Sequence, residues 1–176
     1  MNCILLICET KEDAEYLIKI ADTLPYPLKE IDILSTNPET KFILENHNIS
    51  SVTSAYYVNR KDYKIINSDC MKIYSTLEIN VKKIISRRYS ECFVNMFMYY
   101  TFFALYTIVW NVRLLQNILA LGKYSKFITF APQKNIDISP WFICEQNILH
   151  LLFPRVISNK SIEHVILKRS EVIKSD

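Results

Sequence analysis

The longest uncharged stretch of the chain runs from Cys92 to Val112, 21 residues that include "FVNMFMYYTFFALYTIVW" at 93–110. As a helix it would be about 31 Å long at roughly 1.5 Å per residue, close to the thickness of the hydrocarbon core of a membrane. Three alternatives follow: a membrane span, a buried helix of a soluble domain, or a helix with one face left for a partner or a lipid surface. The choice between them constrains every other interpretation of the chain.

Polar residues inside this stretch and basic residues beside it argue against a span. Asn95, Asn111 and the tyrosines are less favourable in hydrocarbon than Phe or Leu, and basic residues flank both ends, so the positive-inside rule indicates no orientation. A span would also separate the strands predicted before it from those predicted after it. We therefore predict a central helix buried within one soluble domain, with an exposed strip that favours a partner. Phe97→Asp is then expected to unfold or aggregate the protein.

Strand and helix signals alternate along the chain. Strands are predicted at 2–10, 28–35, 51–58, 125–132 and 162–169, and helices at 10–24, from Asn37 and Pro38 onward, at 68–85, from 93 to about 119, and at 140–153. Thr10 and Asp13 resemble a capping box, which marks the first helix start. The alternation predicts an α/β, Rossmann-like fold: a mostly parallel five-stranded sheet in the order 3-2-1-4-5, with helices on both faces and one long apolar helix. We expect one domain covering residues 1–176.

The composition excludes several common functions. The chain has one glycine, Gly122, so neither G-x-G-x-x-G nor the P-loop pattern can be present, and both need glycine where backbone approaches phosphate. The net charge of +3 is too small to indicate an electrostatic nucleic-acid interface, so no nucleic-acid partner is expected.

Cysteine and histidine residues form no recognisable metal or disulfide pattern. The five cysteines are Cys3, Cys8, Cys70, Cys92 and Cys144, an odd number without C-x-x-C spacing. They are typical of reduced core residues in a cytoplasmic protein. The scattered His47, His150 and His164 are expected at the surface or in capping roles rather than as ligands. Neither a metal nor a cofactor is predicted.

A ligand site in a sheet of this order is expected beyond the carboxyl ends of strands one and four. Glu9 follows strand one and is the candidate catalytic residue, as a general base with a raised pKa; the alternative is a solvated carboxylate near a helix N-terminus. The candidate substrate-binding residues are Thr10, Ser35, Gln133, Asp137, Ser139 and Glu145. Ser139 has the alternative role of a helix cap, and Arg87 with Arg88 is either an anion clamp or an exposed helix end.

The order and spacing of "NCILLICET", the long apolar helix, "SKFITFAP" and "SPWFICEQ" resemble the N-terminal acceptor-binding half of GT-B glycosyltransferases over about the first 155 residues. The resemblance implies an acceptor-binding half involved in surface carbohydrate synthesis. The sugar-nucleotide site would then lie on a further domain or on a nucleotide-binding partner chain.

A second hypothesis comes from the apolar helix alone. It is a non-catalytic α/β interaction module that docks a partner protein or a membrane surface, and it predicts association into a homo-oligomer or with lipid. The expected location is the cytoplasm, with peripheral contact to a membrane as the alternative.

Overall fold

The computed structural model describes residues 3–85, 88–131, 148–157 and 162–169. Five parallel strands form one sheet in the order β3-β2-β1-β4-β5, as predicted. The strands are β1 (Ile4–Cys8), β2 (Ile31–Ser35), β3 (Val52–Thr53), β4 (Lys126–Phe130) and β5 (Glu163–Leu167). The fold is therefore α/β and Rossmann-like.

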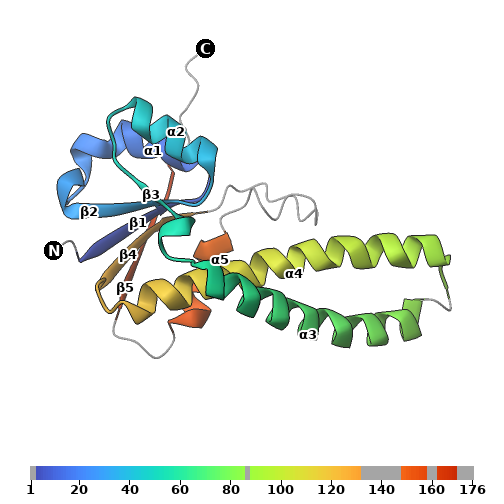
Figure 1. Cartoon of the computed structure of the whole chain (residues 1–176). Coiled ribbons are helices and arrows are strands. Elements are labelled where there is room, and N and C mark those ends of the chain that lie inside the picture. The colour runs from blue at the N-terminus through green and yellow to red at the C-terminus, as the bar shows by residue number, and fades with distance from the viewer. Residues whose placement is uncertain (1–2, 86–87, 132–147, 158–161, 170–176) are drawn as a thin grey trace, which may run out of the picture.

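Helices cover both faces of the sheet (Figure 1). The α-helices are α1 (Lys11–Ile20), α2 (Pro38–Asn46), α3 (Arg60–Ile85), α4 (Glu91–Ala120) and α5 (Ile148–Val156), and the 3-10 helices are η1 (Ala21–Thr23), η2 (Leu28–Glu30) and η3 (Ser54–Tyr56). Helices α1 and α2 lie on one face, whereas α5 and the C-terminal part of α4 lie on the other.

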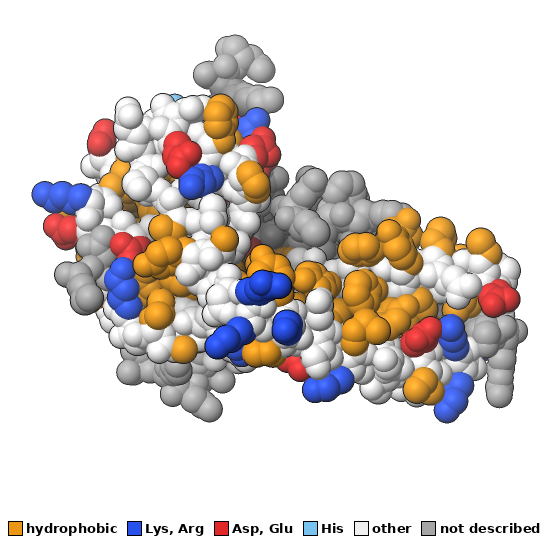
Figure 2. Space-filling view, viewed as in Figure 1, with side chains coloured by type: hydrophobic (Ala, Val, Ile, Leu, Met, Phe, Trp, Pro, Cys, Tyr) orange, Lys and Arg blue, Asp and Glu red, His pale blue; other side chains and the backbone are white. Residues whose placement is uncertain are grey.

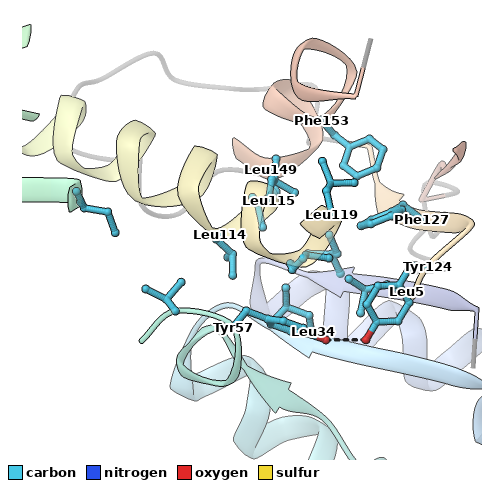
Figure 3. Close-up of a cluster of buried hydrophobic side chains, with 14 residues drawn as sticks. Leu5, Leu34, Tyr57, Leu114, Leu115, Leu119, Tyr124, Phe127, Leu149 and Phe153 are labelled. Atoms are coloured by element: carbon cyan, nitrogen blue, oxygen red, sulfur yellow. Dashed lines mark hydrogen bonds between the residues drawn. The ribbon is translucent and has the colours of Figure 1, made fainter. Parts of the chain in front are cut away.

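Alternate residues of the strands build a core on each face, as the period of two in a strand requires. Leu5 of β1 packs in the cluster that includes Leu115 of α4 and Phe153 of α5 (Figure 3). Its neighbour Leu6 packs in the opposite cluster, which includes Leu17 of α1. Burial on both faces explains why "ILLIC" is apolar at every position.

Helices α3 and α4 form an antiparallel hairpin that extends away from the sheet (Figure 1). The C-terminal turns of α4 join the core through Leu114, Leu115, Ile118 and Leu119. The connection of the hairpin to the sheet domain is also polar: the buried carboxylate of Asp62 on α3 accepts hydrogen bonds from Nε of Arg113 at 2.8 Å and from Nδ2 of Asn117 at 3.0 Å, both on α4.

The prediction of a central buried helix over 93–110 is wrong. Helix α4 is long and apolar enough to cross a membrane, but 11% of the residues in its most apolar 18-residue window are buried. Val94 and Met98 are buried, and Met98 lies beside α3, whereas Phe97 is 41% exposed. The physical reason is length: five-residue strands are about 17 Å long, so this sheet cannot cover a 30-residue helix of about 45 Å.

Two other boundaries differ from the predictions. The strand predicted at 51–58 is limited to Val52–Thr53, because the chain turns into η3 at Ser54. Helix α3 begins at Arg60, eight residues before the predicted start at 68. The earlier start is stabilised by Asn59 and Asp62, whose side chains each accept a hydrogen bond from the other's backbone amide, at 3.4 and 2.9 Å.

Among the described residues, the thiols of Cys8, Cys70 and Cys92 are free, in agreement with the prediction of reduced cysteines; Cys144 lies outside the described residues.

Candidate functional site

Several predicted site residues meet at the carboxyl edge of the sheet. Cys8 of β1 pairs with Ser35 of β2, which places Glu9 and Thr10 beside the residues that follow β2. The amide of Thr36 donates to the carbonyl of Cys8 at 3.1 Å, and this bond joins the ends of the two strands. The prediction that Glu9, Thr10 and Ser35 share one edge of the sheet is confirmed.

Glu9 is buried and fixes α5 to this edge. Its side chain accepts hydrogen bonds from the backbone amides of Leu149 at 2.8 Å and of His150 at 3.2 Å. Burial raises the pKa of Glu9 to about 8, although these amide bonds oppose the rise. The structure agrees with the predicted rise in the pKa of Glu9. It does not agree with the alternative that Glu9 is a solvated carboxylate, because the side chain is buried. The catalytic role of Glu9 stays a prediction.

Thr10 is the N-cap of α1. Its hydroxyl accepts from the amide of Asp13 at 3.3 Å, and the carboxylate of Asp13 accepts from the amides of Glu9 and Thr10 at 2.9 Å each. Asp13 is fully buried and forms an ion pair with Arg169, which follows β5. The expected capping box therefore exists, and it also ties the chain after β5 to the start of α1.

Of the other five predicted binding residues, the structure describes one. Ser35 is buried, and its hydroxyl donates to the hydroxyl of Ser51 at 2.8 Å. Gln133, Asp137, Ser139 and Glu145 lie outside the described residues.

Sequence reasoning missed a histidine pair beside the same edge. The hydroxyl of Thr129, buried in β4, lies 3.2 Å from Nδ1 of His150 and 2.8 Å from Nε2 of His164. Burial lowers the pKa of both imidazoles. The pairing of β4 with β5 and the packing of α5 on the sheet bring these residues together, and no spacing in the sequence marks either contact.

These groups are not arranged as a metal site or as an activated nucleophile. No group of three His, Cys, Asp or Glu side chains within the described ranges is placed to hold a metal ion. Burial raises the pKa of the Cys8 thiol, which disfavours the thiolate. Glu9 and Asp13 accept backbone hydrogen bonds that hold α5 and α1 in place.

A pocket of about 530 Å³ lies at the opposite, amino-terminal edge of the sheet, between Asp32, Ser51, Tyr57 and Lys123. Four of its polar residues, Asp32, Tyr57, Lys123 and Tyr124, form one network. The hydroxyls of Tyr57 and Tyr124 lie 2.8 Å apart (Figure 3), the hydroxyl of Tyr124 donates to Asp32 at 2.8 Å, and Lys123 forms an ion pair with Asp32. This network connects the segments before β4 and α3 to β2.

Exposed apolar side chains gather along the hairpin (Figure 2). We call the following exposed side chains of α4 the apolar face: Phe93, Met96, Phe97, Tyr99, Phe103 and Ile108. At about 100° per residue they span roughly half of the helix circumference, on the side opposite Met98 and α3. No charged residue occurs between Cys92 and Val112, so no charge interrupts this face.

Comparison with protein-family models, with curated protein sequences and with solved structures found no match to this chain.

Proposed function

We propose that the chain is a non-catalytic α/β docking module that attaches peripherally to a membrane surface through the apolar face of α4. One observation carries the proposal. The apolar face covers about half of the circumference of α4, in the part of the helix that extends beyond the sheet, and its side chains are exposed. Contiguous exposed apolar surface of this kind marks an interaction site, because leaving it in water has a large free-energy cost.

Peripheral attachment is favoured over a span because α4 is held by the rest of the structure. Its last turns are buried in the core, and Arg113 and Asn117 hold Asp62 at the base of the hairpin. If α4 spanned a membrane as part of the hairpin, α3 would bring the Asp69–Lys72 and Glu78–Lys82 ion pairs into hydrocarbon, where charged groups are strongly disfavoured.

Flotation with vesicles of phosphatidylcholine and phosphatidylglycerol tests the proposal. Phe97→Asp should lower the vesicle affinity by about tenfold to a hundredfold, the equivalent of one exposed Phe buried on binding. Phe42→Asp is the matched control, because Phe42 is exposed on α2 of the sheet domain. If wild type does not float, or if both variants lose affinity equally, the proposal is wrong.

The second candidate function is the acceptor-binding half of a glycosyltransferase. The specific observation in its favour is Glu9, a buried carboxyl group with a pKa of about 8 at the carboxyl edge of the sheet, a value suited to a general base. A thermal-shift screen with oligosaccharide acceptors tests it. Saturable stabilisation that Ser35→Ala weakens would support acceptor binding at this edge, and a screen without stabilisation would contradict it.

A further inference from the structure

The turn of the hairpin combines basic and apolar side chains. We call residues 79–84 and 88–97, on either side of the turn, the hairpin tip. Its exposed apolar side chains are Ile79, Ile84, Tyr89, Phe93, Met96 and Phe97, and its exposed basic side chains are Lys82, Lys83 and Arg88. Ser90 caps α4 at the tip by accepting from the amide of Phe93 at 3.4 Å, and the rings of Tyr89 and Phe93 stack with centroids 4.9 Å apart. These two contacts fix the start of α4 at the tip.

Positive charge is concentrated in the hairpin. Residues 60–113 contain nine Lys and Arg against four Asp and Glu, a net charge of +5, whereas the whole chain has +3. The remaining residues therefore carry a net charge of −2. Glu91 is the one acidic residue between 79 and 97. An anionic surface would attract the tip and repel the sheet domain, which defines an orientation as well as an affinity.

We propose that the hairpin tip recognises an anionic lipid surface, an inference that rests on the proposed membrane-docking function. Lys83 and Arg88 donate hydrogen bonds to lipid phosphate groups, while Phe93 and Phe97 enter the boundary between headgroups and acyl chains. Basic residues beside aromatic and aliphatic side chains are the composition that binds anionic bilayers at the interface. Lys82 contributes less, because it forms a 2.7 Å ion pair with Glu78.

Charge favours an anionic membrane over a second copy of the chain. Two hairpins that paired through their apolar faces would bring two net charges of +5 together, which opposes association. A bilayer can also accommodate both the apolar face and the basic tip, because acyl chains and phosphate groups occur at adjacent depths.

The test compares the full-length chain on two kinds of vesicle, phosphatidylcholine alone and phosphatidylcholine with about three parts in ten of phosphatidylglycerol. The tip variant is Lys83→Gln with Arg88→Gln. The control is Lys61→Gln with Lys64→Gln, which removes the same charge from exposed positions at the base of α3, about 33 and 28 Å from Lys83 along the helix. Circular dichroism of all proteins verifies that the helices are retained.

We expect wild type to bind the anionic vesicles at least about tenfold more tightly than the neutral ones, and this preference should decrease as salt shortens the Debye length. The tip variant should lose about 30-fold on anionic vesicles and little on neutral ones, since each basic residue near an anionic surface contributes about one kcal/mol. The control should lose less than about threefold.

Other outcomes separate the inference from the proposed function. Equal wild-type binding to both vesicles, or equal losses for the tip variant and the control, would overturn the inference and leave membrane docking intact. Binding to neither vesicle would overturn both. Concentration-dependent dimerisation that Phe97→Asp abolishes, without vesicle binding, would assign the apolar face to a second copy instead.

Discussion

The Oε1 atom of Glu9 accepts a hydrogen bond from the backbone nitrogen of Leu149, 140 residues further along the chain, over 2.8 Å. This contact holds the N-terminal turn of the described α5 against the carboxyl end of β1. The carboxyl group is 6% exposed, and its pKa of about 8 means that folding changes its protonation at neutral pH.

Glu9→Gln should reduce the pH dependence of stability between about pH 7 and pH 8.5. The folded-state pKa is raised from 4.5 to about 8, so the stabilising contribution of the protonated form is fully present below about pH 4.5 and is lost as the pH rises through about 8. In wild type the free energy of unfolding should fall by up to about 1.4 kcal/mol per pH unit in this window.

Urea unfolding at both pH values measures this effect. Glu12→Gln is the control, because Glu12 is exposed on α1. The half-buried His150 and His164 have pKa values below 6.5, so they contribute little in this window. Equal pH slopes for wild type and Glu9→Gln would contradict the assignment.

Thr129→Val should destabilise the fold by about 1 to 3 kcal/mol, because it leaves ring nitrogens of His150 and His164 without their hydroxyl partner at a buried site. Valine has nearly the volume of threonine, so a loss of hydrogen bonding rather than of packing is measured. Thermal or urea unfolding at neutral pH provides the value. A change below about 0.5 kcal/mol would show that the contacts contribute little.

The same histidines predict a second pH effect, of opposite sign. Burial lowers the pKa of His164 below 6.5, so its contribution to stability is present above about pH 6.5 and is lost as the pH falls through the folded-state value. His164→Gln should therefore lose less stability than wild type between about pH 7 and pH 5. His47→Gln, at an exposed position, should retain the wild-type slope.

Asp62→Ala should cost about 2 to 4 kcal/mol, because Asp62 is 3% exposed and bonds the amide of Asn59 and the side chains of Arg113 and Asn117. Asp69→Ala is the matched control on the same helix, since Asp69 is exposed and makes only a 3.7 Å ion pair with Lys72 among the described ion pairs; it should change stability by less than about 0.5 kcal/mol. Equal losses would show that the polar base of the hairpin is not important for stability.

The order of the strands could be predicted because each buried strand and each amphipathic helix carries its own local pattern. The prediction for 51–58 failed since β-branched and aromatic residues are equally suited to η3 and to the buried Tyr57 and Val58. Glu9, Thr10 and Ser35 could be placed at one edge because parallel strands end together. The proximity of His150 to His164 requires both the register of β4 with β5 and the packing of α5 on the sheet, which no local pattern specifies.

The apolar composition of residues 93–110 predicted a helix, but it did not indicate whether other parts of the protein would cover that helix. An apolar helix buried in a core and one exposed on a hairpin have the same composition, and only the lengths of the neighbouring strands distinguish them. Phe97 was expected in the core for this reason, and it lies on the exposed apolar face instead.

Phe97→Asp and Met98→Asp should therefore have opposite consequences, although the two residues are adjacent in α4. Phe97 is 41% exposed, so its carboxylate variant stays hydrated, and the free energy of unfolding should change by less than about 1 kcal/mol. Met98 is 2% exposed and lies against α3, so an aspartate there is buried without a partner and should cost about 3 kcal/mol or more. Urea unfolding of the two variants in the absence of lipid provides the comparison. Equal destabilisation would show that Phe97 is covered in solution, and the apolar face would then be part of the core after all.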